Sequence, residues 1–187
     1  FRLRRTALRW DFSFFAVLAV FFLWDSSGFG FAALGICAVH ELGHLAVMRL
    51  CGMIPESLTF YGAGIRLTAP AVERSSAPVR AAVYCAGCVV NFLIFAAGMA
   101  LGYQRIAAIS LAAGMFNLLP VGEFDGKRLL KMLLVNRLPA ENVDRTLTVC
   151  GIISAAICAA VVFLLRGASP TFFITAAYLL VLSAREL

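Results

Sequence analysis

The sequence predicts an all-α polytopic membrane protein with about six transmembrane helices. Of its 187 residues, 62% are hydrophobic and only 14% are charged, whereas an average soluble domain is about half apolar and about a quarter charged. The mean hydropathy is +0.92. The apolar residues also come in blocks long enough to cross a hydrocarbon layer of about 30 Å, which takes roughly 20 residues of helix. A soluble fold is therefore disfavoured.

Six hydrophobic segments can be drawn as spans, although the first and the fourth are short. They cover residues 8–24, 29–50, 79–103, 106–120, 147–165 and 169–184. No polar stretch between them is long enough to fold as a separate soluble unit, and no internal repeat is present. Residues 1–187 are therefore expected to form a single membrane domain.

The basic residues predict the orientation of the chain in the membrane. A net charge of +6 in a soluble protein would raise the question of nucleic acid, but cytoplasmic loops of membrane proteins collect Lys and Arg. Placing the N-terminus in the cytoplasm leaves Arg105 and Arg166 as the only basic residues on the outer side. We therefore expect both termini to be cytoplasmic, and we expect no nucleic-acid partner.

A short β-hairpin is expected between the second and third spans. Leu58, Phe60, Ile65 and Leu67 alternate with other residues around the Gly-containing segment 61–64, which is the pattern of two strands joined by a turn. Because open strand edges are not tolerated against lipid, this hairpin must lie on the helices or at the membrane surface. Its free edge could accept an extended substrate segment, and the alternative is an ordinary interfacial loop.

The candidate catalytic residues lie in the second span. The chain has two histidines, and both fall in the run His40-Glu-Leu-Gly-His44. Residues i and i+4 of a helix share one face, so both imidazoles can bind one Zn²⁺. Glu41 can then act as general base toward a water whose pKa the metal lowers to roughly 7. Since Arg49 follows five residues after His44, the site is expected nearer the cytoplasmic face.

The alternative for this run is a polar patch that joins helices without a metal. It fits poorly, because a charged residue at the centre of a membrane costs roughly 2.5 to 3.5 kcal/mol on insertion scales. A Glu between two His is therefore expensive unless a cation or a water-filled cavity compensates.

A third zinc ligand has to come from elsewhere, since a catalytic zinc usually has three protein ligands and one open position. The pair Cys85-x-x-Cys88 resembles half of a zinc site, but no second pair follows, and these thiols are interpreted as packing residues. Carboxylates near an apolar span remain, and they are Asp11, Asp25, Glu123 and Asp125.

Glu123 and Asp125 lie just past the fourth span, where the chain must bend. Pro120 and Gly122 break the helix, and Gly126 is expected to allow a tight turn. Because the fourth span descends toward the cytoplasm, this bend reaches about the depth of the histidines. The residues alone leave both carboxylates open as the third ligand.

Three motifs resemble those of the site-2 protease family of intramembrane metalloproteases, especially its compact sporulation-type members. The run 40–44 fits the family's H-E-x-x-H, and Asn117-x-x-Pro120-x-x-x-x-Asp125-Gly126 fits its second motif in residue type and spacing. The segment Ala86-Gly-Cys-Val-Val-Asn91 resembles its A-G-P-x-x-N, with Cys88 where proline is usual. The resemblance extends over residues 35–130 and implies a core of six helices with a membrane-associated strand segment.

The resemblance implies that His40, His44 and Asp125 hold one zinc ion per chain and that Glu41 is the catalytic base. Glu123 remains the rival third ligand.

Asn117 and Asn91 are implied by the resemblance to assist catalysis. From the residues alone, an amide beside a metal could donate to a developing oxyanion, or it could form hydrogen bonds between helices.

These expectations combine into a zinc metalloendopeptidase that cuts membrane-tethered regulatory proteins within the bilayer, in a bacterial plasma or sporulation membrane. The resemblance supplies the substrate class, such as transcription-factor precursors or anti-sigma factors, and allows for a membrane regulatory protein as a further partner. One alternative is a non-catalytic membrane metal carrier or scaffold. Another is a membrane-anchored zincin that acts on soluble peptides.

Overall fold

The structure of the chain is a computed structural model that describes residues 2–3, 6–62 and 64–166. The sixth expected span, residues 169–184, lies outside the described residues. The chain groups into two compact units, Phe1–Met115 and Phe116–Leu187, and each unit is described below by itself. That residues 1–187 form a single domain stays a prediction.

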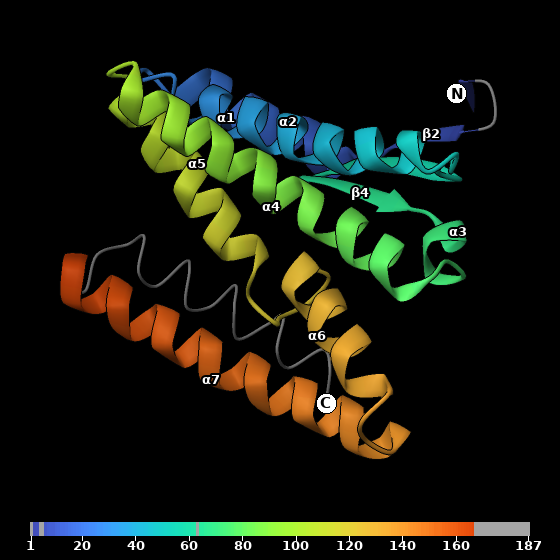
Figure 1. Cartoon of the computed structure of the whole chain (residues 1–187). Helices are drawn as coiled ribbons and strands as arrows, with labels where there is room; N and C mark the ends of the chain where they lie inside the picture. The colour runs from blue at the N-terminus through green and yellow to red at the C-terminus, as the bar shows by residue number, and fades with distance from the viewer. Residues whose placement is uncertain (1, 4–5, 63, 167–187) are drawn as a thin grey trace. The chain divides into compact units, whose positions relative to one another are not determined.

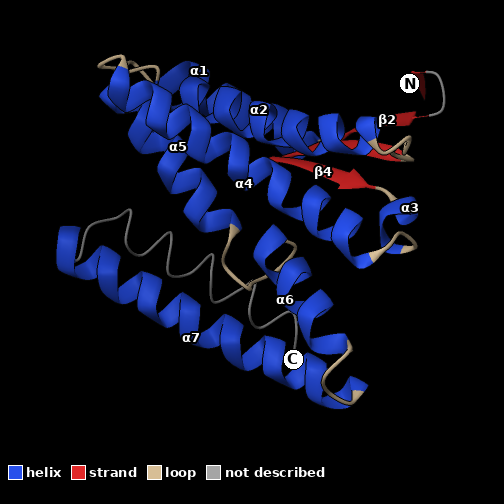
Figure 2. Ribbon diagram, viewed as in Figure 1, coloured by secondary structure: helices blue, strands red, loops and turns tan. Residues whose placement is uncertain are grey.

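Helices make up most of the described chain, and a small sheet accompanies them (Figures 1 and 2). The strands are β1 (Arg2–Leu3), β2 (Thr6–Trp10), β3 (Ser57–Tyr61) and β4 (Gly64–Thr68). The helices are α1 (Phe12–Trp24), α2 (Phe29–Leu50), α3 (Pro70–Glu73), α4 (Ala77–Ala100), α5 (Gln104–Asn117), α6 (Asp125–Val135) and α7 (Ala140–Arg166).

Three of these helices are long and apolar enough to cross a membrane: α2, α4 and the Ala140–Val161 part of α7. They confirm the second, third and fifth predicted spans. In place of the first and fourth spans the chain forms α1 and α5, which have 13 and 14 residues. At 1.5 Å per residue these helices are about 20 Å long. A helix of this length cannot by itself cross a hydrocarbon core of about 30 Å. Six full spans are therefore not confirmed.

The beginning of the first predicted span, residues 8–10, was predicted wrongly. Residues Thr6–Trp10 form β2, which pairs in parallel with β3 and places Leu8 opposite Leu58. The indole of Trp10 stacks on the ring of Phe60, with ring centroids 4.0 Å apart. Strand β2 was not predicted because its residues continue into the apolar run that ends at Trp24. Its pairing partner β3 lies 50 residues further along the chain, so the local sequence carries no sign of the pairing.

The hairpin prediction is confirmed. Strands β3 and β4 are antiparallel, with Leu58 opposite Leu67 and Phe60 opposite Ile65, and Gly64 takes a positive φ of 135° beside the turn. The sheet order is β1-β2-β3-β4, so β2 covers one edge of the hairpin. Strand β4 packs against α2 and is an outer strand among the described strands. A substrate segment could therefore pair only with the β4 side of the hairpin, and this role stays a hypothesis.

The first unit is organised around α2 and α4, which lie side by side (Figure 1). The contact depends on Gly43 of α2, where an added Cβ would lie 3.0 Å from the carbonyl oxygen of Ala86. Helix α5 joins α4 through Ser110, whose hydroxyl donates to the carbonyl oxygen of Asn91 at 2.8 Å. Small residues and buried hydrogen bonds of this kind are the usual means by which helices associate in membranes.

The second unit contains the bend that follows α5. Helix α5 ends at Asn117, and Gly122 takes a φ of +56°, as expected for a helix break near Pro120. The residues after the bend lie between the fourth and fifth predicted spans, and Asp125–Val135 form the basic amphipathic helix α6. Gly126 lies in the first turn of α6 and not in a tight turn. It is required because an added Cβ would collide with the carbonyl group of Leu118.

Replacement of Gly43 by alanine tests the contact between α2 and α4. The added methyl group overfills a close helix contact, and we expect Gly43→Ala to lower the free energy of unfolding by about 1 to 3 kcal/mol. Gly35→Ala on the same helix is the matched control, because an added Cβ there meets nothing within 4 Å. Thermal unfolding in detergent measures both variants, and equal melting temperatures would contradict this packing.

Candidate metal centre

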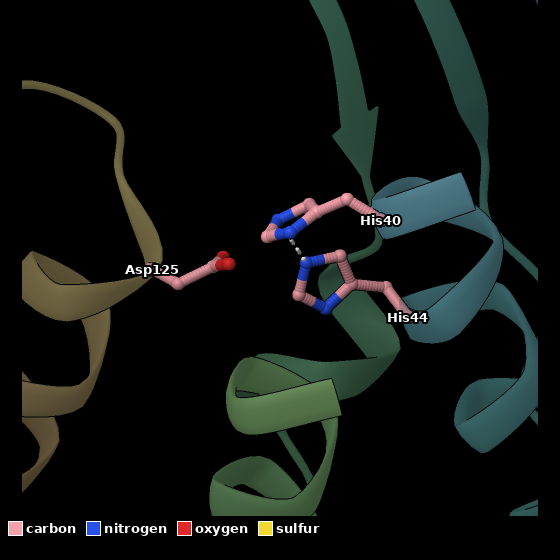
Figure 3. Close-up of side chains that lie close together, drawn as sticks. All are labelled: His40, His44 and Asp125. Atoms are coloured by element: carbon pink, nitrogen blue, oxygen red, sulfur yellow. Dashed lines mark hydrogen bonds between the residues drawn. The ribbon is translucent and has the colours of Figure 1, made fainter. Parts of the chain in front are cut away.

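Helix α2 carries both histidines on one buried face. His40 and His44 are one helical turn apart, and their side chains are 3% and 6% exposed. Their Nε2 atoms lie 3.1 Å apart, and the dashed line in Figure 3 joins the two rings. Glu41 follows His40 directly and is half-buried. The predicted pairing of the two imidazoles on one helix face is therefore present in the structure.

Helix α4 fixes the orientation of both imidazole rings. Nδ1 of His44 lies 2.7 Å from the carbonyl oxygen of Val83, and Nδ1 of His40 lies 3.1 Å from the side-chain amide of Asn91. Val83 and Asn91 are eight residues apart and thus lie on one face of α4. Each ring is held at Nδ1, which leaves the two Nε2 atoms facing each other. Histidine ligands of metals are commonly oriented in this way by a hydrogen bond at the second ring nitrogen.

Gly87 provides the space for the two rings. It lies midway between Val83 and Asn91 on the same face of α4, and a Cβ at this position would collide with the imidazoles of both His40 and His44. Any residue larger than glycine would therefore displace the rings. Gly87 belongs to the sequence motif of residues 86–91. The sequence did not predict that a glycine is needed there to make room for the two rings, because this need arises from the packing of α4 against α2.

Asp125 is the third residue of the candidate centre. It is the first residue of α6, and its side chain is 6% exposed. The ligand atoms that His40, His44 and Asp125 offer all lie within 4.8 Å of one another (Figure 3). In residues 2–3, 6–62 and 64–166 this is the one group of at least three His, Cys, Asp or Glu side chains close enough to hold a metal ion.

The other candidate carboxylates are not in this group. Glu123 is exposed. Asp11 accepts hydrogen bonds from the backbone N–H and the hydroxyl of Ser13 at the beginning of α1. Asp25 accepts from the hydroxyl of Ser27 at 2.7 Å, and this bond lowers the pKa of the carboxyl below its usual value. Both aspartates are therefore engaged as helix-start residues.

The geometry of the two histidines fits a zinc ion. Two nitrogen ligands about 2.0 to 2.1 Å from a tetrahedral zinc lie about 3.3 Å apart, and the observed separation of the Nε2 atoms is 3.1 Å. Two imidazoles and one carboxylate are also a common ligand set for catalytic zinc. The residues present can therefore hold the metal that the sequence predicts.

The two asparagines and the cysteines take different places. Asn91 is fully buried and contacts His40, so its side chain reaches the centre through a histidine. Asn117 is the last residue of α5 and is half-buried. All six cysteines are free thiols, and Cys88, which stands where proline was expected, is buried within α4 without interrupting the helix.

Comparison with known proteins gives a likeness to a solved structure. No protein-family model matches the chain, and no curated protein matches it. Among solved structures, the chain is similar to the site-2 protease from Methanocaldococcus jannaschii, with a TM-score of 0.69 and 17% sequence identity. The match covers 100% of this chain and 93% of that chain. The chain therefore has the fold of a polytopic membrane protein of this type.

Replacement of Gly87 by alanine tests whether α4 shapes the metal centre. The methyl group would push both imidazoles out of position, and we expect zinc affinity to fall by about 10- to 100-fold, as for other residues that support metal ligands. Gly98→Ala is the control, because it also overfills a contact of α4, with Ala107, but far along the helix from the histidines. Zinc titration in detergent measures the affinity of both variants. An equal loss of zinc affinity in the two would contradict a specific role for Gly87.

Proposed function

We propose that the chain is an intramembrane zinc metalloprotease of the site-2 protease family, from its compact sporulation-type branch. The observation that carries the proposal is the buried group of His40, His44 and Asp125 in a chain that has the fold of a solved site-2 protease. The fold likeness alone, at 17% identity, does not identify an activity. The three sequence motifs supply the link, because each places a functional residue type at the spacing that the family has.

In this proposal His40 and His44 hold one zinc ion through Nε2, and Asp125 holds it through a carboxylate oxygen. A bound zinc ion would supply a Lewis acid that polarises the scissile carbonyl group and makes water more acidic. The rings form hydrogen bonds with the carbonyl oxygen of Val83 and the side-chain amide of Asn91, and these bonds keep the ligand atoms in place. Proton transfer and stabilisation of the oxyanion are proposed for the protein side chains.

Glu41 is the proposed general base. It would accept a proton from the attacking water and return it to the amide nitrogen that leaves, so that the carboxylate is regenerated. This role is supported by its place in the turn of α2 that carries both histidines and by its half-buried side chain. Asn117 is proposed to donate a side-chain N–H to the developing oxyanion, which is supported by its place in the motif that also contains Asp125.

The proposed substrates are membrane-tethered regulatory proteins. The histidines lie on α2, one of the helices long enough to span a bilayer, so the centre is reached by segments that are already in or on the membrane. An extended substrate segment could pair with the outer edge of β4, because backbone hydrogen bonds bind a strand without regard to its sequence. The basic residues of α6, Lys127, Arg128 and Lys131, support a centre on the cytoplasmic side.

Two rival functions lead to different measurements. A membrane metal carrier or scaffold would use the same histidines without needing Glu41 for turnover. A membrane-anchored zincin would cleave soluble peptides that have no apolar segment. The proposed enzyme requires both Glu41 and a membrane-inserted substrate.

Replacement of Glu41 by glutamine tests the proposed chemistry. Glutamine keeps the shape of the side chain but cannot accept the proton, and we expect the cleavage rate of a membrane-tethered substrate to fall by about 10²- to 10⁴-fold. Bound zinc should stay at the wild-type level, because Glu41 is not a ligand in this account. Cleavage in proteoliposomes and metal analysis check the two expectations, and an unchanged cleavage rate would favour a contaminating protease or another base.

Replacement of the carboxylates tests the ligand set. Asp125→Ala is expected to lose bound zinc, because removal of one of three ligands leaves an incomplete site. Glu123→Ala is the matched control two residues away, and its exposed side chain should not affect metal content. Metal analysis of the purified variants gives the answer. Zinc retained in Asp125→Ala but lost in Glu123→Ala would overturn the assignment.

A further inference from the structure

Helix α6 carries a basic side. Lys131 follows Arg128 by three positions and Lys127 by four, so these three side chains share one side of the helix. Arg137 follows just after the end of the helix, and its side chain is exposed. The one acidic residue of α6, Asp125, is its first residue and is buried. The accessible charge of α6 is therefore positive.

The apolar side of α6 is covered at its beginning and open at its end. Gly126 lies against the carbonyl group of Leu118, and Leu129 and Leu133 follow Gly126 at helical spacing on the same side. Leu129 is half-buried, whereas Leu133 is 53% exposed. A basic helix with an open apolar side is typical of helices that lie in the plane of a membrane surface.

Helix α7 indicates where the membrane surface lies. Its charged residues before Arg166 are Glu141, Asp144 and Arg145, and residues 146–165 carry no charge. A charge-free segment of this length can cross a hydrocarbon core of about 30 Å. The charged residues at the beginning of α7 therefore stand at one boundary of that core.

An ion pair places α6 at this boundary. Nζ of Lys131 lies 3.8 Å from Oδ1 of Asp144, and α6 packs on α7 (Figure 1). Both side chains are more than half exposed, so Lys131 remains accessible to other anions. Because Asp144 stands next to the charge-free segment, the basic side of α6 lies at the depth of the lipid headgroups.

We propose that α6 is an interfacial helix whose basic side binds the phosphate groups of anionic phospholipids, with Leu133 in contact with the lipid chains. Lys and Arg provide positive charge and N–H donors for phosphate oxygens, and basic clusters beside a membrane span attract anionic lipids. A lipid also covers the open apolar end of the helix, which a free phosphate ion cannot do. The inference goes beyond the proposed function and does not depend on the metal site.

Native mass spectrometry of the purified protein in detergent measures lipid binding. The wild type is titrated with phosphatidylglycerol, which is anionic, and with phosphatidylcholine, which has no net charge. We expect phosphatidylglycerol to bind more tightly. Excess inorganic phosphate should not displace it, because inorganic phosphate has no chains that contact Leu133.

Paired substitutions test whether α6 is the site. Arg128→Gln together with Lys131→Gln should lower the affinity for phosphatidylglycerol by about fivefold for each charge removed. Arg49→Gln together with Arg74→Gln is the matched control, because it removes two exposed basic side chains outside α6 and should leave this affinity unchanged. Arg128→Lys together with Lys131→Arg keeps both charges and should bind phosphatidylglycerol as the wild type does.

Hydrogen exchange of the wild-type protein in nanodiscs locates the site without a substitution. The backbone amides of α6 should exchange more slowly in nanodiscs of phosphatidylcholine mixed with phosphatidylglycerol than in nanodiscs of phosphatidylcholine alone, because bound lipid holds the helix. The amides of β3 and β4 are the internal control, and their exchange rates should be the same in both kinds of nanodisc.

Four outcomes would overturn the inference. They are equal affinity of the wild type for the two lipids, an equal loss of affinity in the α6 variant and its control, displacement of the lipid by inorganic phosphate, and equal exchange of α6 in the two kinds of nanodisc. A dimer in the mass spectra that Leu133→Gln dissociates would also overturn it, because a second copy of the chain would then cover the open end of α6. If the paired variants do not fold, the exchange rates of α6 in the wild type still decide.

Discussion

The buried pair of imidazoles is the feature on which the rest of this structure depends. Polar groups inside an apolar helical protein are costly unless hydrogen bonds or a shared cation satisfy them. His40 and His44 are both buried, and each has its Nδ1 within hydrogen-bond distance of α4. Helix α4 therefore has to lie against α2 at one register. The glycines at positions 43 and 87 allow the two backbones to come close enough for these bonds.

The candidate centre could be predicted to a large extent because histidine, the main ligand type in it, is rare in this chain. A chain with two histidines has few ways to build a nitrogen-ligand site, and their spacing of four residues places both on one helix face. The helix break at Pro120 made both Glu123 and Asp125 candidates, and the resemblance to the family's second motif pointed to Asp125. What could not be predicted is the support from α4, since a backbone carbonyl such as that of Val83 has no sequence signature.

The fold was predicted well for the long helices and less well for short elements. The bounds of α2 agree with the prediction, because a glycine with a positive φ stands close to each end of the apolar run, Gly28 before Phe29 and Gly52 after Leu50. Strand β2 was missed because strand pairing across 50 residues depends on its partner. Helix α6 was not among the predicted elements, because it lies between two predicted spans and its basic residues, which occupy the polar side of an amphipathic helix, keep it from being a continuous apolar run.

The coordination of zinc in the purified protein tests the central claim most directly. X-ray absorption at the zinc edge reports the number, type and distance of the ligands. The account predicts one zinc per chain with nitrogen and oxygen neighbours about 2.0 to 2.1 Å away, including the outer-shell signal of two imidazoles. A folded protein without zinc, or a zinc with sulfur neighbours about 2.3 Å away, would contradict it.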